Sequence, residues 1–322
     1  MVESLSTFLR TAWTIRYIWY TANLQTMTTR KAILIGYPGE GNGRLPGVGK
    51  DLSNMYRYLQ TPRGGGWRRE EITVLRGPES AELLQEVALC SADYLLVYFS
   101  GHGMAEPVVE WTGEIAVYRW LLINGEELFQ DLQLLNSQAA RQIVICDCCR
   151  TRPGATIGGI PETLEEWSFT VEEFYAAREA FDEYIHLSPP GAVIVHGAQD
   201  GRPSYDSKDG GRFTLALLGG ALDWRTGSAW SPIPIGWLVD YAGAVLGDAR
   251  RAQVPEIVYQ DGDLRVPFGL DTPWPLEGVV EDDVPETLDR RLVQPAPLPD
   301  PARTWLVLGG LVVGALWLGS RG

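Results

Sequence analysis

The hydrophobic positions of the chain fall into short apolar runs that alternate with amphipathic segments. Compact apolar runs bounded by turn residues are typical of buried strands, and they occur here as KAILIGY, EITVLRG, DYLLVYFSG, RQIVICDCC and GAVIVHG. Apolar side chains at helical spacing occupy 48–60, 80–90 and 213–222. Buried strands that alternate with helices predict an α/β fold, a three-layer αβα sandwich around a mostly parallel sheet.

Two internal segments depart from this alternation. Residues 115–136 form a less regular stretch. Residues 150–190 are interpreted as an insertion or processing segment, because Pro and Gly end the preceding strand and an acidic helical stretch follows over 162–187.

The composition changes near both ends of the chain. Residues 1–27 form an N-terminal extension that lacks the apolar run and cleavage site of a secretory signal, and Met27 is an alternative start. We expect one globular domain over 28–269. Residues 270–303 are rich in Pro, Asp and Glu with little periodicity, which predicts an extended linker.

The last apolar segment, 304–320, carries no charge and lies between Arg303 and Arg321. As a helix it would reach about 25 Å, slightly less than the roughly 30 Å hydrocarbon core of a bilayer. Gly310 and Gly314 have the small-xxx-small spacing of helix contacts in lipid. We predict a transmembrane tail anchor. A terminal helix packed on the domain is the alternative, and the evenly placed arginines leave the orientation open.

Charge and cysteine content limit the possible partners and compartment. The 322 residues carry a formal net charge of -14, which argues against a nucleic-acid partner, because phosphate binding needs clustered Lys and Arg. Basic partners suit the chain better. The cysteines give no readable disulfide framework, since three of the four fall within four residues: Cys90, Cys146, Cys148 and Cys149. A reducing compartment fits this pattern.

A histidine and a cysteine stand at the ends of two predicted strands. His102 lies between Gly101 and Gly103, and Cys149 follows the apolar run of another strand about 50 residues later. Functional groups gather at the carboxyl ends of parallel strands, so the two side chains can meet. A thiol nucleophile needs a base and oxyanion donors, for which the amides of Gly103 and Cys149 are the candidates.

Four segments in this order resemble caspase-like cysteine peptidases, specifically their metacaspase and orthocaspase branch. The segments are ILIGYPGEGNGRLPGVGKDLSNMY, YFSGHG, VICDCCR and GAQDGRPSYDSKDGGRFTLALL. The likeness covers roughly 31–269, and the ordered pair of histidine and cysteine motifs is far more specific than either alone. The resemblance implies a caspase-like fold, with His102 as general base and Cys149, rather than Cys148, as nucleophile.

The same resemblance implies a specificity. The family's acidic pocket for P1, the residue before the cleaved bond, falls on Asp51, Ser100 and Asp147, with Val48 where a cysteine is common. Converging carboxylates would bind a guanidinium and repel an acidic side chain, which implies cleavage of protein substrates after exposed Arg or Lys. A caspase-type preference for Asp is the alternative. From the residues alone, Asp51 is interpreted as a residue that starts or caps a helix, and Asp147 as one that accepts hydrogen bonds from backbone donors.

The chain departs from the family pattern in two places. Arg150, Thr151 and Arg152 stand where many metacaspases have His-Ser-Gly. The stretch after the histidine motif offers only Glu110 and Glu114 where relatives carry an acidic run for calcium, and a hard cation wants six to eight oxygen ligands. We therefore assemble no metal site, and the thiol chemistry requires no cofactor.

Relatives suggest a setting and a mode of control. They imply a bacterial protein anchored in the inner membrane with a cytoplasmic peptidase domain, acting in antiviral defence or regulated cell death. A zymogen activated by an upstream protease and a non-catalytic adaptor are the alternatives in function. Arginines expected in or near flexible segments, and so candidate autoprocessing sites, are Arg150, Arg152, Arg178 and Arg202.

The remaining cysteines and histidines read as structural. Cys90 and Cys146 are expected to be buried and inert, as free cysteines commonly are. His186 and His196 are interpreted as structural too. A metal or redox role for the cysteine cluster lacks a second ligand pair at zinc-like spacing.

Overall fold

The computed structural model describes residues 28–148, 169–247, 253–261 and 266–272. Cys149 and the segment 304–320, on which two of the expectations above fall, lie outside these described residues. Among the described residues, no helix is both long and apolar enough to span a bilayer.

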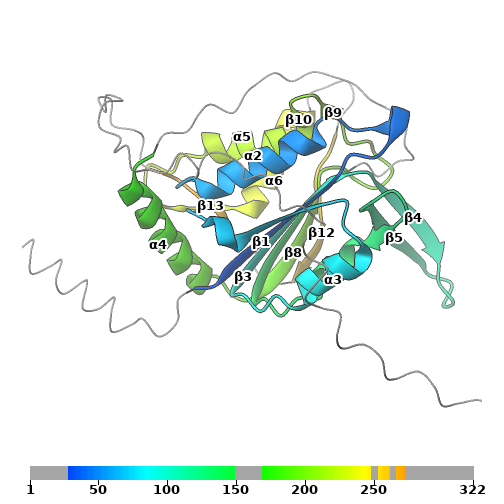
Figure 1. The fold of residues 1–322 in the computed structure, drawn as a ribbon, viewed down its shortest axis with the longest axis horizontal. Helices are drawn as coiled ribbons and strands as arrows, with labels where there is room; N and C mark the ends of the chain where they lie inside the picture. Colours follow the sequence, from blue (N-terminus) through cyan, green and yellow to red (C-terminus); the bar gives the residue numbers. More distant parts are fainter. Residues whose placement is uncertain (1–27, 149–168, 248–252, 262–265, 273–322) are drawn as a thin grey trace, which may run out of the picture. The chain divides into compact units, whose positions relative to one another are not determined.

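Six strands of the described chain form the central sheet, in the order β12-β8-β7-β3-β1-β2 (Figure 1). Their bounds are β1 Arg30–Tyr37, β2 Ile72–Arg76, β3 Tyr94–Gly101, β7 Arg141–Cys148, β8 Gly191–His196 and β12 Glu256–Asp261. The first five run parallel, and β12 pairs antiparallel with β8 at the edge. The predicted mostly parallel sheet is confirmed.

Helices cover both faces of this sheet (Figure 1). One face carries α2 Val48–Gln60, α4 Val171–Leu187, α5 Arg212–Asp223 and α6 Ile235–Gly247, and the other carries α3 Ser80–Ala88. Each layer has its own buried apolar cluster against the sheet. Strand β3 is buried along its whole length. A strand that is covered on both faces needs mostly apolar residues, which explains the apolar run in its sequence.

The less regular stretch over 115–136 contains defined elements. Strands β4 Gly103–Val109, β5 Ile115–Leu122 and β6 Leu128–Gln130 form an antiparallel sheet, followed by the 3-10 helix η3 Asp131–Leu135. The outer part of this sheet is exposed, and Ile115 is 70% accessible. Exposed apolar residues weaken the alternation that identifies a strand, because neither face is consistently polar there.

Helix α4, which lies within the stretch interpreted as an insertion or processing segment, packs into the core. Thr170 caps the helix by accepting a hydrogen bond from the amide of Glu173 at 3.1 Å, and the Glu173 carboxylate accepts from the Thr170 amide in return. Ala177, Phe181 and Ile185, four residues apart, are fully buried in the same cluster as α2 and α5. One face of this acidic helix therefore packs on the sheet.

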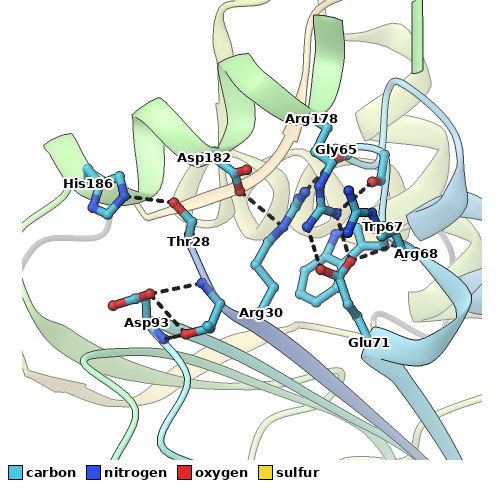
Figure 2. A network of polar contacts seen from close by, with 12 residues as sticks. Thr28, Arg30, Gly65, Trp67, Arg68, Glu71, Asp93, Arg178, Asp182 and His186 are labelled. Atoms are coloured by element: carbon cyan, nitrogen blue, oxygen red, sulfur yellow. Dashed lines mark hydrogen bonds and ion pairs between the residues drawn. The ribbon is translucent and has the colours of Figure 1, made fainter. Parts of the chain in front are cut away.

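A polar network fixes α4 to the start of the sheet (Figure 2). Arg178 makes two hydrogen bonds to the Glu71 carboxylate, at 2.8 and 2.5 Å, and a third to the carbonyl of Gly66. Burial by itself would raise the pKa of Glu71, but the Arg178 hydrogen bonds, the charge of Arg30 and the hydrogen bond from the Arg68 amide together outweigh it and lower that pKa. Arg178 is buried, so the expectation that it lies in a flexible segment as a candidate cleavage site was wrong.

Arg30 forms the second part of this network. Its guanidinium lies 5.2 Å from the ring centres of both Trp67 and Phe181, and it pairs with Asp182 at 3.1 Å. Burial lowers the pKa of Arg30 to about 10. Strand β1 and helix α4 are thus joined by charge as well as by apolar packing.

Short elements complete the described chain. They are η1 Gly41–Gly43, η2 Arg69–Glu71, β9 Asp206–Ser207, β10 Gly210–Gly211, β11 Pro232–Pro234 and β13 Pro267–Leu270. Strand β13 pairs with β11, and the amide of Leu270 donates to the carbonyl of Arg63 at 2.7 Å. The β9–β10 hairpin lies near the start of α2, at the end of the sheet where the candidate site is found.

Candidate functional site

His102 directly follows β3 and is half-buried. Its carbonyl accepts a hydrogen bond from the Leu122 amide of β5 at 2.9 Å, so the small antiparallel sheet holds its backbone. Its Nε2 lies 2.8 Å from the carbonyl oxygen of Gly43. A carbonyl can only accept, so Nε2 carries the proton, and in the neutral ring Nδ1 keeps its lone pair. In the neutral ring, Nδ1 is therefore the nitrogen that can accept a proton.

The loop between β1 and α2 comes unusually close to His102. Gly39 in this loop has φ +76°, and a side chain there would place its Cβ 2.6 Å from His102 Nε2. Only glycine combines that backbone conformation with so close an approach. The contact between His102 and the Gly43 carbonyl could not be predicted from residue types, because every residue has a backbone carbonyl.

Strand β7 aligns the cysteine motif with the histidine motif. Ser100 pairs in register with Asp147, and Gly101 pairs with Cys148. Cys148 is buried among apolar residues, and its Sγ lies 3.9 Å from Nδ1 of His196. Cys149 follows it in the chain, just as His102 follows Gly101. The dyad of His102 and Cys149 stays a prediction, since Cys149 is not among the described residues.

The four residues predicted for a P1 pocket lie together. Val48, Asp51, Ser100 and Asp147 line one cavity of about 20 Å³. We call this cavity the acidic pocket. Its other lining residues are Leu45, Gly101, Cys148, Ser204, Tyr205, Asp206 and Gly211.

Neutral groups hold the two predicted carboxylates. Asp51 accepts hydrogen bonds from the Ser100 hydroxyl and the Gly211 amide, both at 2.8 Å. Asp147 accepts from the Ser204 hydroxyl at 2.9 Å and from the amide and hydroxyl of Thr214 at 3.0 and 2.6 Å. These bonds fix where the carboxylates point without neutralising their charge.

Asp206 is a third carboxylate in the acidic pocket, and the sequence analysis did not single it out. It opens β9, and its Oδ2 accepts a hydrogen bond from the Gly47 amide at 2.9 Å. The segment that carries it was matched to a substrate-binding loop, so an acidic residue in that loop was the available signal.

The three carboxylates share a raised affinity for protons. Burial and the charge of Asp147 raise the pKa of Asp51 well above its ordinary value, and burial also raises the pKa of Asp147. Burial, with a contribution from Asp147, raises the pKa of Asp206 from 3.8 to about 6. Among the described lining residues there is no Lys or Arg to balance them. The acidic pocket is therefore suited to a cation.

Backbone atoms must come close to these carboxylates to donate to them. A Cβ at Gly211 would lie 2.2 Å from Asp147 Oδ2 and 3.1 Å from Asp51 Oδ2. Glycine at this position thus lets the main chain reach two carboxylates at once.

The remaining expectations concern the oxyanion hole and calcium. Gly103 opens β4 next to His102 and pairs in register with Leu121. Its proposed partner as donor, the Cys149 amide, lies outside the described chain. In the described chain no group of three or more His, Cys, Asp or Glu side chains could hold a metal ion. Glu110 accepts a hydrogen bond from the Tyr118 hydroxyl at 2.9 Å.

The structural residues lie as expected. Cys90 and Cys146 are buried. His186 Nε2 lies 2.7 Å from the Thr28 hydroxyl, and His196 is buried beside Asp131.

Comparison with known proteins places this arrangement in a family. The Caspase domain family matches residues 29–229. Among solved structures, protein GSU0716 from Geobacter sulfurreducens is 18% identical, with a TM-score of 0.44, over 76% of this chain and 98% of that one. Caspase-1 from Spodoptera frugiperda is 17% identical, with a TM-score of 0.45, over 72% and 88%. A search of curated proteins gave no match.

The family match contains both His102 and the cysteine motif, together with most of the acidic pocket's lining. It spans more than half of the chain. This chain therefore belongs to the caspase domain family of cysteine peptidases.

Proposed function

We propose that this chain is a cysteine endopeptidase that cleaves proteins after Arg or Lys. The observation that carries the proposal is the acidic pocket, where Asp51, Asp147 and Asp206 converge with no described cation among the lining residues. A P1 guanidinium or ammonium would supply the missing positive charge. A P1 Asp would meet three like charges instead.

Electrostatics favours a basic side chain for a specific reason. Each of the three carboxylates has a raised pKa, which means that its ionised form is disfavoured where it stands. A cation that enters the pocket stabilises the ionised forms, and charge-assisted hydrogen bonds fix its orientation. The preference is therefore one of charge and geometry together.

The proposed reaction uses His102 and Cys149. His102, held by the Gly43 carbonyl, takes the thiol proton on Nδ1 while the sulfur attacks the carbonyl carbon of the P1 residue. The same ring protonates the leaving amine, and a water then hydrolyses the thioester with His102 as base. The amides of Gly103 and Cys149 are the proposed oxyanion donors. None of these steps needs a cofactor.

Paired fluorogenic peptides with Arg or Asp at P1 test this function. The parent chain, Cys149→Ala and the matched control Cys90→Ala would be compared, with calcium and with chelator. We expect cleavage after Arg that is lost in Cys149→Ala and kept in Cys90→Ala. Cleavage after Asp would contradict the role of the acidic pocket. Silence with both peptides, together with no labelling by a peptidyl-arginine thiol probe, would favour an adaptor.

The small volume of the acidic pocket favours an activation step. A cavity of about 20 Å³ has room for roughly one water, so a basic side chain needs the surrounding loops to move. We propose that cleavage after Arg150 or Arg152 permits this movement. Limited treatment with a trypsin-like protease should then raise the Arg-peptide activity, and substitution of both arginines by Gln should abolish the increase. An unchanged rate after complete cleavage would contradict the step.

We also propose that residues 304–320 anchor the chain to a membrane, as their uncharged sequence supports. Fractionation of expressing bacteria should place the full chain in the membrane pellet and a chain ending at residue 303 in the supernatant. Equal distribution of the two would contradict the anchor.

A further inference from the structure

A second constellation of Cys, His and Asp lies apart from His102, inside the apolar core. Asp131, His196 and Cys148 are each at most 2% exposed. Asp131 Oδ2 lies 2.8 Å from His196 Nε2, and His196 Nδ1 lies 3.9 Å from Cys148 Sγ. Burying such polar groups costs free energy unless each finds a partner, so their meeting at one point needs an explanation.

The proton positions follow from the chemistry of the three groups. An ionised carboxylate only accepts, so in the neutral ring Nε2 of His196 carries the proton and donates to Asp131. Nδ1 then keeps its lone pair and faces the thiol of Cys148, which can donate to it. The three side chains form one directed chain of hydrogen bonds that ends on the strand carrying the cysteine motif.

Three elements meet in this chain of bonds. Cys148 ends β7, His196 ends β8 and Asp131 begins η3. Helix η3 directly follows β6, which pairs with β5. Strand β5 in turn holds the carbonyl of His102 through the amide of Leu122. The same small sheet therefore carries Asp131 and fixes His102.

We propose that Asp131, His196 and Cys148 are positioning residues, which lock the end of β7 to the small sheet that holds His102. The inference rests on the proposed function, because the nucleophile Cys149 directly follows Cys148. A shift at the end of β7 would move both the thiol and its oxyanion amide relative to the base. None of the three side chains reacts with substrate.

Four substitutions separate this role from ordinary core packing. His196→Leu removes both hydrogen bonds, whereas His196→Gln keeps a donor for Asp131 and an acceptor for Cys148. Phe129→Leu is the matched control, because Phe129 is 1% exposed on neighbouring β6 and packs in the same cluster without a polar role. Asp131→Asn, which preserves volume and weakens the charge-assisted bond, serves if His196→Leu does not fold.

We expect His196→Leu to lower kcat for an Arg peptide at least about tenfold, since small displacements of reacting groups have costs of this size or larger. KM should stay within about twofold, because His196 does not line the acidic pocket, and His196→Gln should restore most of kcat. Phe129→Leu should lower Tm while kcat, measured where all variants are folded, stays unchanged. A kcat that simply follows Tm across all variants would overturn the proposal.

A second measurement does not depend on peptidase activity. The rate at which iodoacetamide labels Cys149, read by peptide mass spectrometry, reports how well the thiol is paired with its base. It should fall in His196→Leu and recover in His196→Gln. If this pattern appears in a chain that cleaves no Arg peptide, the proposed function fails, whereas the positioning role of Asp131, His196 and Cys148 stands. Equal labelling rates in all variants overturn the positioning role, whatever the peptidase activity.

Discussion

Neutral donors hold each carboxylate of the acidic pocket, so the charge of the pocket depends on pH and on what binds there. Asp51 and Asp147 are almost completely buried, whereas Asp206 is only partly buried and opens the β9–β10 hairpin. Asp206 is therefore the carboxylate whose titration is easiest to observe. Its pKa of about 6 lies close to neutral pH.

Asp206 should make the folded state less stable as pH rises. Its pKa is about 6 when folded and 3.8 when unfolded, so between these values the folded state binds more protons and loses stability with increasing pH. Asp206→Asn lacks this penalty. Discounted for partial exposure to about 1 kcal/mol, the effect corresponds to roughly 2–4 °C in Tm.

Thermal unfolding at pH 4 and pH 7 measures this difference. The Tm of Asp206→Asn minus that of the parent should be larger at pH 7. Asp209→Asn, which changes a half-buried carboxylate in the same hairpin turn but outside the lining of the acidic pocket, is the control. A difference that is constant with pH would contradict the raised pKa.

Gly39 and Gly41 allow a matched test of how His102 is held. Both have positive φ, but a Cβ at Gly39 would meet the His102 ring, whereas one at Gly41 would meet nothing within 4 Å. Gly39→Ala should lower kcat for Arg peptides about 100-fold, the size of effect that a 1 Å misplacement produces. Gly41→Ala carries similar backbone strain and should keep its kcat. Equal losses in both variants would mean that strain alone is responsible.

At the scale of elements, two charge pairs join α4 to the rest of the domain. Arg178 contacts Glu71 beside β2, and Asp182 contacts Arg30 of β1 (Figure 2). The helix follows the cysteine motif in the chain, with 149–168 outside the described residues. Arg30 and Glu71, which attach this helix to the sheet, come before the cysteine motif in the chain, whereas the helix comes after it.

Arg178→Met should destabilise the fold by roughly 3–5 kcal/mol, because it leaves the Glu71 carboxylate partly buried without its partner. The double variant Arg178→Met with Glu71→Leu should recover much of the loss. Urea unfolding would measure both, with Arg202→Met, at an exposed arginine, as the control. If the double variant were no more stable than Arg178→Met, the unpaired charge would not be the cause.

At the scale of the whole molecule, the central sheet could be predicted from its apolar runs. Elements that face solvent, and contacts made by backbone atoms, could not be predicted from the sequence. Strands β3 and β7 are buried along almost their whole length, so each contains a central run of apolar residues. The β4–β5 hairpin was missed because its outer half faces solvent. The Gly43 carbonyl leaves no trace in residue type, and Asp206 becomes recognisable only when the hairpin brings it beside Asp51.

Cleavage after Arg150 or Arg152 should leave two fragments that stay together. Strands β7 and β8 pair side by side across that cut, and the acidic pocket takes carboxylates from both fragments. Size-exclusion chromatography should give one peak at the mass of the parent, while denaturing electrophoresis shows two bands. Separate elution of the fragments would contradict this picture of the core.

Gly43 and Gly47 belong to one short loop, and they hold the base and the pocket respectively. Gly43 fixes His102 and Gly47 fixes Asp206. A side chain that draws Asp206 toward itself therefore pulls on the same loop that aims the imidazole. Recognition and turnover become mechanically coupled, as in enzymes that use induced fit. An ill-fitting substrate would then be penalised in its rate of conversion even when it is present at saturation.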